Sequence, residues 1–537
     1  MRIVVNAESV LLSSISLLVL SGISQPARAE SADTLFTKGL FNEASSKYLH
    51  EIKSDPHNAS LRMDEIRTLL RIDGDSWQEA ITQGQAAVKI APDNADAHGL
   101  YSMALMRGGM PEEAVTQANK ALSLNPKAYF ALVAAGRAAE WNENKKQAKA
   151  DYLKAITLFP HRATAYPYFL GTLDSDKDKK YIPLFKQYVK LHAKGFPHSD
   201  LMRDFSDSHF LKQKEKNKAD DQKVTSSFAP AKATAAEVSA APNPAEEDVV
   251  YSIPFTRDDG GIVLPVKIHG VLYHMLLDTG AGDGVTLTHQ AVHTLGLDPV
   301  GQSVQSGVSG YEIGKIYEAG DMQVGTEYFH NVEVESMSDA SGHTDGLIGG
   351  YVFKKSVLTF DFANNNLIIS TGKDAKAPEP SQDDAVMTVP FHLYHGYIFV
   401  PVVLGDRTKS EYALLDTGCE PLGVLSIHTA KDLAKLQNSD SYENVTINQR
   451  LGVGTSDPSF NALIFRFSVD LTMAHATGLP LMEELNPIFG ANFIDRSVDP
   501  SFDFQLCGIV GIPYLENAKI VTIDYPHKLL TMEYANN

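Results

Sequence analysis

Hydrophobic side chains recur with a helical period through the first part of the chain. Apolar positions fall on one face of segments such as Ala97–Gly108, Ala114–Pro126 and Gln147–Pro160, which predicts amphipathic helices. Because proline cannot continue a helix, a proline that recurs in phase with these segments predicts where every second helix ends. An alanine and a proline recur with the same steps of 36, 34 and 34 residues, at Ala44, Ala80, Ala114 and Ala148 and at Pro56, Pro92, Pro126 and Pro160.

The pattern changes after a polar stretch, residues 211–248, whose lysine, alanine and proline content predicts a flexible linker. Beyond it, short β-branched segments alternate apolar and polar positions, and turn residues separate them, as in Val249–Phe255 and Ile262–Ile268. A second linker, residues 373–385, interrupts this part of the chain. The sequence therefore predicts two β units, residues 249–372 and 386–537.

The in-phase helical pairs resemble the tetratricopeptide repeat family, whose small-residue and closing-proline positions they match. The tryptophan and tyrosine positions of that family are poorly kept, so the version here is degenerate. The resemblance implies that residues 30–210 form an all-α solenoid whose concave surface binds a protein or peptide partner. A purely structural spacer is the open alternative.

The two β units repeat three sequence blocks in the same order. Each has an apolar strand that ends in Asp-Thr-Gly, at Asp278 and at Asp416, then two apolar residues before a glycine, Gly349 or Gly511. Each closes with a strand pair that has Asp-aromatic at its turn. The interval between motif aspartate and glycine is 71 residues in the first copy and 95 in the second. The second copy therefore carries about 24 extra residues, which we expect within Ala474–Gln505.

These duplicated blocks resemble the retropepsin-like aspartic protease family over residues 249–536. The resemblance implies an all-β bilobal acid-protease fold in which two lobes meet at a pseudo-twofold axis and each supplies one aspartate. The implied catalytic pair is Asp278 and Asp416. The implied supporting residues are threonines that cross-brace the two loops, glycines that let them turn and glycines that pack beneath them: Thr279, Thr417, Gly280, Gly418, Gly349 and Gly511.

The chemistry of the family needs both carboxyl groups. Like charges about 3 Å apart cannot both ionise readily, so the pair shares one proton. The charged carboxylate acts as general base on a bound water, and the protonated one stabilises the developing oxyanion. The family also closes a glycine-containing hairpin, the flap, over its substrate. The segments that fit this role are Ser306–Lys315, with Gly307, Gly310 and Tyr311, and more weakly Leu451–Ser456, with Gly452 and Gly454.

The implied function is an aspartic endopeptidase that hydrolyses protein or peptide substrates, with the helical repeats recruiting substrates or partner proteins. Two alternatives stay open: a peptide-binding scaffold that keeps the protease fold without turnover, and a dimer in which each lobe pairs with a copy from another molecule. Cys419 and Cys507 either form a disulfide or are two free, buried thiols, and we favour the thiols.

Charge and the amino-terminal segment restrict partners and location. The net charge of −19 and the pI near 5.4 disfavour nucleic acid as a partner, because an acidic surface repels phosphate backbones. Met1–Ala29 combines the apolar run Val10–Ile23 with an Ala-Arg-Ala cleavage site, which predicts a signal peptide and a periplasmic or extracellular protein. No later segment is apolar enough to span a bilayer. The histidines lack ligand spacing, so we expect no metal and no cofactor.

Overall fold

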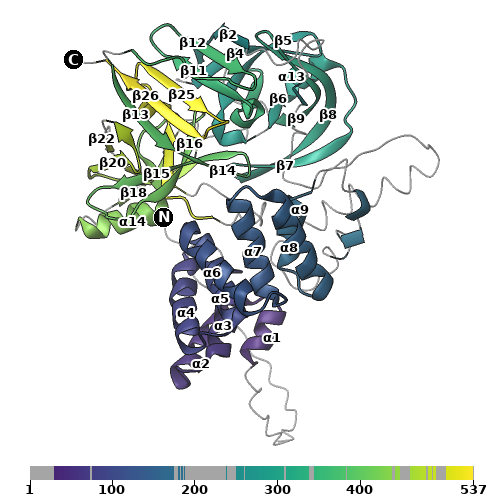
Figure 1. Cartoon of the computed structure of the whole chain (residues 1–537), viewed down its shortest axis with the longest axis vertical. Coiled ribbons are helices and arrows are strands. Elements are labelled where there is room, and N and C mark those ends of the chain that lie inside the picture. Colours follow the sequence, from purple (N-terminus) through teal and green to yellow (C-terminus); the bar gives the residue numbers. More distant parts are fainter. Residues whose placement is uncertain are drawn as a thin grey trace, which may run out of the picture.

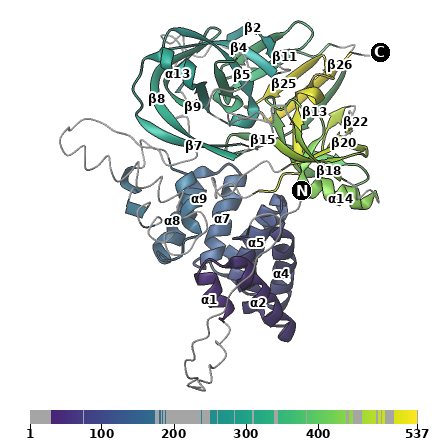
Figure 2. The ribbon, with the colours of Figure 1, turned by 180° about the vertical axis from the view of Figure 1, so that it is seen from behind.

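The computed structural model has a helical part and a β part, with the helices below the strands in Figures 1 and 2. It describes residues 30–173 apart from 73–74, residues 179–187 apart from 182, 185 and 186, residues 237–238, and residues 249–535 apart from 259–260, 283, 308–309, 338–343, 382–383, 438–441, 448–459, 479–481, 486–487 and 492–503. The predicted fold class, an all-α repeat region followed by an all-β bilobal region, is confirmed. The predicted signal peptide lies outside the described residues.

The helical part is a row of helix pairs whose ends follow the sequence repeat. The four recurring alanines are all fully buried, because the helices approach each other closely at these positions. Each recurring proline stands two residues beyond the end of a helix, as Pro56 does after Ser54. The helices are α1 (Ala32–Thr37), α2 (Phe41–Ser54), α3 (Ala59–Leu69), α4 (Ser76–Ile90), α5 (Ala95–Arg107), α6 (Pro111–Leu124), α7 (Tyr129–Trp141), α8 (Lys145–Leu158) and α9 (Ala165–Gly171).

Each β lobe is organised around one sheet, and the two sheets share a strand order. In lobe 1 the order is β1 (Glu237–Val238), β9 (Glu327–Met337), β6 (Val285–Thr288), β10 (Gly346–Gly349), β5 (Val271–Asp278), β4 (Gly261–Ile268), β8 (Gly310–Val324) and β7 (Gly301–Gly307), with β3 (Thr256–Asp258) beside β4. In lobe 2 it is β18 (Tyr442–Ile447), β19 (Phe460–Phe465), β23 (Ile488–Ala491), β17 (Val424–Ser426), β24 (Gly508–Gly511), β16 (Glu411–Asp416), β15 (Tyr397–Leu404), β20 (Val469–Met473) and β22 (Met482–Leu485), with β14 (His392–Tyr394) beside β15. The duplication seen in sequence is therefore a duplication of topology.

Short helices follow matching strands in the two lobes. In lobe 1, α13 (His289–Leu295) follows β6, and the 3-10 turns η3 (Thr279–Ala281) and η4 (Gly350–Phe353) follow β5 and β10. In lobe 2, α14 (Ile427–Leu436) follows β17 and α15 (Ile512–Leu515) follows β24.

A third sheet joins the lobes. Its order is β2 (Val249–Pro254), β12 (Asn366–Thr371), β11 (Ser356–Asp361), β25 (Ile520–Asp524), β26 (Leu529–Tyr534), β13 (Ala385–Pro390) and β21 (Thr477–Gly478). At its centre β11 of lobe 1 pairs antiparallel with β25 of lobe 2, and the hydroxyls of Thr359 and Thr522 lie 3.1 Å apart. One hydrophobic core runs through both lobes, so the lobes pair with each other within one chain.

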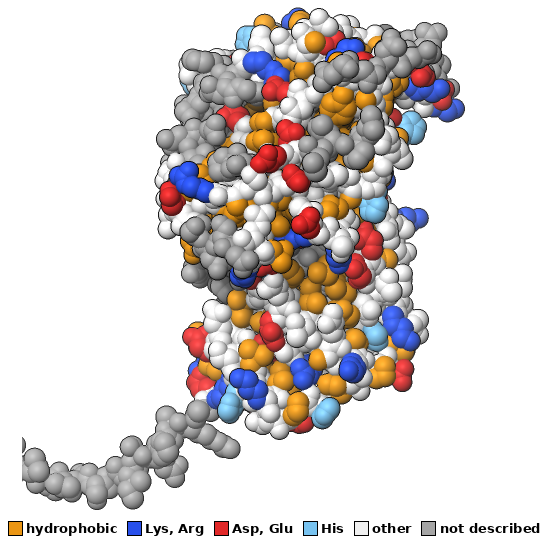
Figure 3. Space-filling model, turned by 90° about the vertical axis from the view of Figure 1, so that its left-hand side faces the viewer, with side chains coloured by type: hydrophobic (Ala, Val, Ile, Leu, Met, Phe, Trp, Pro, Cys, Tyr) orange, Lys and Arg blue, Asp and Glu red, His pale blue; other side chains and the backbone are white. Residues whose placement is uncertain are grey.

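The helical part packs on lobe 2, and the strands there are apolar on both faces. Along β15, Ile398 and Val400 face the lobe core, whereas Phe399 joins the core of the helical part. Because successive strand residues point to opposite faces, this continuous apolar run is buried from two sides. The ring of Trp141, at the end of α7, stacks on Phe504 of lobe 2 with centroids 5.4 Å apart. Figure 3 shows hydrophobic side chains gathered where the helical part meets the lobes.

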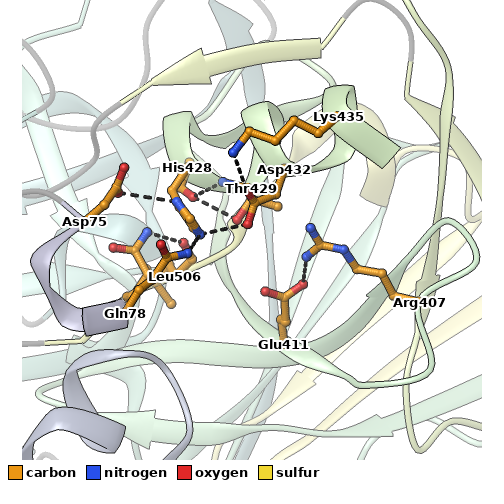
Figure 4. A network of polar contacts seen from close by, with 11 residues as sticks. Asp75, Gln78, Arg407, Glu411, His428, Thr429, Asp432, Lys435 and Leu506 are labelled. Carbon is orange, nitrogen blue, oxygen red and sulfur yellow. Dashed lines mark hydrogen bonds and ion pairs between the residues drawn. The ribbon is translucent and has the colours of Figure 1, made fainter. Parts of the chain in front are cut away.

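Polar contacts surround this apolar interface, and they come from successive turns between helices. His428 of α14 contacts Gln78 of α4 at 2.7 Å and Asp75 at 3.4 Å (Figure 4). One repeat further along, the Tyr412 hydroxyl donates to Glu112 at 2.8 Å and Lys409 donates to Glu113 at 2.9 Å.

The next turn along the helical part, between α7 and α8, continues this series. There Glu143 pairs with Lys528 of lobe 2. The edge of the helical part that carries these turns therefore faces lobe 2.

Candidate active site

Two matching strands carry Asp278 and Asp416 to the boundary between the lobes. Asp278 ends β5 and Asp416 ends β16. Each strand has a parallel neighbour, β10 or β24, and this register puts Gly349 opposite Asp278 and Gly511 opposite Asp416. Both aspartates are buried, at 0% and 2% exposed. The fold thus brings together two acids that are 138 positions apart in the sequence.

The two Asp-Thr-Gly loops are cross-braced by their threonines. The Thr279 hydroxyl donates to the Leu415 carbonyl at 2.7 Å, and the Thr417 hydroxyl donates to the Leu277 carbonyl at 2.7 Å. Each hydroxyl also accepts from the backbone N–H of the other threonine, both at 3.0 Å. These four buried bonds are reciprocal, so each loop fixes the position of the other.

Each motif glycine lies against the aspartate of the opposite lobe. A Cβ added at Gly280 would lie 2.6 Å from Cγ of Asp416, and a Cβ added at Gly418 would lie 2.7 Å from Cγ of Asp278. A real Cβ does not approach other atoms so closely, so a side chain at either position would displace the opposing carboxyl group. The glycines therefore let the two carboxyl groups approach each other across the pseudo-twofold axis.

Burial governs the protonation of this pair. Burial, and then the negative charge of Asp416, raise the pKa of Asp278 well above its ordinary value. Burial likewise raises the pKa of Asp416, and its Oδ1 accepts a hydrogen bond from the Gly418 backbone at 2.8 Å. A carboxyl pair that resists ionisation holds a shared proton to higher pH than two isolated aspartates would.

The raised pKa values predict that the aspartate pair lowers the free energy of unfolding at neutral pH, where unfolded aspartates are ionised and the buried pair resists ionisation. A group whose folded-state pKa exceeds its unfolded value stabilises the fold fully below the unfolded pKa, and this contribution is lost as pH rises through the folded pKa. We therefore expect Asp278→Asn to be more stable than the wild type at pH 7, by on the order of 1 kcal/mol or about 2–4 °C in Tm. Calorimetry at pH 7 and near pH 4 tests this. The gain should shrink at the lower pH, and a variant less stable than wild type at pH 7 would contradict the prediction.

The segment predicted as the first flap forms the tip of the β7–β8 hairpin. In its register Ser306 pairs with Tyr311 and Gly307 pairs with Gly310. The second predicted flap, with Gly452 and Gly454, lies outside the described residues. The strands on either side of it, β18 and β19, pair with each other.

Other acids and cysteines of the two lobes have structural surroundings. Asp361 accepts hydrogen bonds from Asn364 at 3.1 and 2.7 Å, and Asp524 accepts one from the His527 backbone at 2.9 Å, which are local hairpin contacts. Cys419 and Cys507 are both free and buried, so the disulfide alternative is wrong and the favoured interpretation is confirmed. Within the described residues, no cluster of histidine, cysteine, aspartate and glutamate could hold a metal ion.

Sequence reasoning missed the hairpin formed by β14 and β15. Its tip, His395 and Gly396, reaches the loop that follows Asp278, and its outer face packs on α7. The signal was present in the run Tyr397–Leu404, where apolar residues occupy both faces of a strand. Such a run predicts cover on both sides, although it does not reveal what provides the cover.

Comparison with known proteins agrees with this geometry. Residues 264–352, from β4 to η4 of lobe 1, match the aspartyl protease family. The search of curated proteins found no match. Together with the helical repeats, the family match confirms the predicted arrangement of a tetratricopeptide-type region followed by an aspartyl-protease domain.

Solved structures resemble the helical part. The crystal structure of MamA is 20% identical, with 36% of this chain and 93% of that chain covered and a TM-score of 0.21. TTC0263, a thermophilic TPR protein of Thermus thermophilus, is 17% identical, with 30% and 85% covered and a TM-score of 0.24. YrrB, described as a TPR protein with an unusual peptide-binding site, is 16% identical, with 30% and 82% covered and a TM-score of 0.21.

Proposed function

We propose that this chain, in which tetratricopeptide-type helices precede an aspartyl-protease domain, is an aspartic endopeptidase. The observation that carries the proposal is the reciprocity of the two motif loops. Thr279 and Thr417 brace each other's loops, and Gly280 and Gly418 make room for each other's aspartates. A fold that only bound peptides would not require two buried acids whose pKa values are both raised.

In the proposed mechanism Asp278 and Asp416 share one proton and activate a water molecule. The ionised carboxylate takes a proton from water, whose oxygen attacks the scissile carbonyl carbon, and the protonated carboxyl donates a hydrogen bond to the carbonyl oxygen. When the tetrahedral intermediate collapses, the C–N bond breaks and the leaving amine nitrogen takes up the proton that the general base had accepted from water, which restores the ionised carboxylate. The roles are assigned to the pair, because the two titrations are coupled.

The β7–β8 hairpin, with Gly307, Gly310 and Tyr311 at its tip, is proposed to close over the substrate. Closure would exclude water from the buried pair and strengthen its electrostatic interactions. The segment with Gly452 and Gly454 is proposed to act in the same way from lobe 2.

The proposed substrates are proteins or peptides outside the cytoplasm. Export rests on the signal-peptide pattern of Met1–Ala29. None of the helices in the described part of the chain is long and apolar enough to cross a membrane. The helical repeats are proposed to recruit substrates or partner proteins on a surface other than the edge that contacts lobe 2.

A peptide-library digest with purified wild type and Asp278→Asn tests the proposal. We expect wild type to cut internal peptide bonds and the variant to cut them on the order of at least 10²-fold more slowly. Binding of peptides by both proteins without cleavage by either would instead establish the scaffold alternative. Analytical ultracentrifugation of the active protein should show a monomer, because the two lobes pair within one chain.

A further inference from the structure

The β14–β15 hairpin of lobe 2 crosses to the catalytic loop of lobe 1. Its two-residue tip has positive φ at both positions, 52° at His395 and 85° at Gly396, which is the geometry of a tight hairpin turn. A Cβ added at Gly396 would lie 3.3 Å from Cδ1 of Tyr351 and 3.6 Å from Cα of Gly282. A Cβ added at Gly282 would lie 3.7 Å from the His395 carbonyl oxygen and from Cζ of Tyr397. The tip therefore lies against lobe 1, with room for little more than one added carbon atom between them.

Gly282 belongs to the loop that carries Asp278, only four positions further along the chain. Its carbonyl accepts a hydrogen bond from the Tyr351 backbone at 2.9 Å, and Tyr351 follows Gly349 and Gly350. The tip of the hairpin thus lies against two segments of lobe 1, at Gly282 and Tyr351, that flank the loop of the catalytic aspartate. A shift of the tip would be transmitted directly to that loop.

The other side of the same hairpin rests on the end of α7. Trp141 stacks on His392 with centroids 4.3 Å apart and an interplanar angle of 26°, and it also contacts Tyr394 at 5.8 Å. Oε1 of Glu140 lies 4.0 Å from Nε2 of His395 at the tip. These contacts reach from the base of the hairpin to its turn, and Figure 1 shows the end of α7 beneath β14.

The supporting residues of α7 are themselves held in place within the helical part. The Tyr152 hydroxyl of α8 donates to Oε2 of Glu140 at 2.5 Å. Arg137, which is 1% exposed, donates to the Tyr168 hydroxyl of α9 at 3.1 Å. Buried polar groups with fixed partners rigidify their surroundings. The end of α7 is therefore held in a fixed position beside the hairpin.

Among the residues that the structure describes, the contact between a helix of the helical part and this hairpin is seen in lobe 2 and has no counterpart in lobe 1. The matching hairpin of lobe 1, β3–β4, also crosses to the other lobe, where Arg257 pairs with Glu516 beyond α15. The Arg257 and Glu516 side chains are partly exposed, and neither residue belongs to the helical part. One hairpin is thus fixed by a surface ion pair and the other by a buried helix end.

We propose that Glu140 and Trp141 are positioning residues of the peptidase, which hold the β14–β15 hairpin against the loop that carries Asp278. The inference rests on the proposed function, and it makes the helical part a component of the catalytic domain in addition to any recruiting role. The helical part is then required for turnover of small peptides that are too short to reach its other surfaces.

Amide hydrogen exchange of residues 279–284 in the full-length protein tests the proposal without reference to activity. We compare Glu140→Gln and Trp141→Ala with Glu113→Gln, which removes a carboxylate from the same edge of the helical part but contacts Lys409, away from the hairpin. Exchange in this loop should accelerate about 10-fold in Trp141→Ala, and less in Glu140→Gln, because the loop opens more readily once the tip is released. Glu113→Gln should match the wild type.

Steady-state kinetics with a short peptide provide the second readout. A misplaced catalytic group lowers turnover, so kcat should fall on the order of 10-fold in Trp141→Ala and Glu140→Gln while KM changes less than about twofold. Trp141→Phe, which keeps an aromatic ring on His392, should recover most of the activity, which separates positioning from misfolding.

Wild-type exchange in residues 279–284 for both Glu140→Gln and Trp141→Ala would overturn the inference and leave the endopeptidase proposal intact. A wild-type protein that cuts no peptide would overturn the proposed function, and the exchange measurement would still decide whether α7 positions the loop.

Discussion

Asp278→Asn and Asp416→Asn should each lower kcat/KM for peptide cleavage by on the order of 10²–10⁴-fold, because positioned proton transfer contributes that much to the rate. Both carboxyl groups are buried beside each other, and each lies against the motif glycine of the opposite lobe. Asparagine has nearly the same shape but cannot share the proton. Kinetics with a quenched fluorescent peptide measure the loss.

The double variant gives the sharper test of the shared mechanism. Groups that act as one unit lose their function together, so the double variant should be no slower than either single variant. Asp361→Asn is the matched control, because Asp361 also ends a duplicated strand but accepts its hydrogen bonds from Asn364 in its own hairpin turn, away from the aspartate pair. It should change kcat/KM less than about twofold. If either active-site variant kept full activity, the dyad mechanism would be wrong.

Thr279→Val should destabilise the β lobes by about 2–5 kcal/mol, because two buried backbone groups would lose their hydrogen-bond partner. The Thr279 hydroxyl serves both the Leu415 carbonyl and the Thr417 N–H, and valine fills the same volume without replacing either bond. The loops would then be held from one side only. We expect kcat to fall at least about 10-fold as well, since catalysis depends on the relative position of the two aspartates.

Calorimetry is the appropriate measurement, because Trp77 and Trp141, the two tryptophans of the chain, lie where the helical part contacts lobe 2, so their fluorescence would mix the signals of the two parts. Thr279→Ser is the control. It keeps the hydroxyl and loses a methyl group that packs near Gly350, so it should cost only about 1 kcal/mol. A valine variant as stable as the serine variant would show that the cross-brace contributes little to the fold.

The sequence determined the parts of this protein that repeat. The steps between alanines and prolines predicted the helix pairs, because a helix that must pack closely needs a small residue and a proline ends it. The duplicated motif predicted that Asp278 and Asp416 end matching strands, and the cross-brace of Thr279 and Thr417 has the predicted form. A repeated pattern predicts local structure well, because each copy has the same spacing of small, apolar and turn residues and therefore forms the same elements.

The sequence predicts that the extra residues of the second copy lie within Ala474–Gln505, but it does not show what this segment contacts. Part of Ala474–Gln505 forms β22 and β23 of the lobe 2 sheet. Its last residues include Phe504, which stacks on Trp141, and Gln505, whose N–H donates to the Arg107 carbonyl at 2.8 Å. Aligning the two copies shows how many residues are inserted, but it does not show which part of the molecule those residues contact.

What only the tertiary structure decided is the docking of the helices on lobe 2 and the support of the β14–β15 hairpin by α7. Trp141 and His392 are 251 positions apart, and neither carries a motif. The two-sided apolar run of β15 showed that both of its faces need cover, but hydrophobic periodicity records only which side chains avoid water. Which surface supplies the cover depends on the shapes and polar partners of two folded units, and these exist only after each has folded.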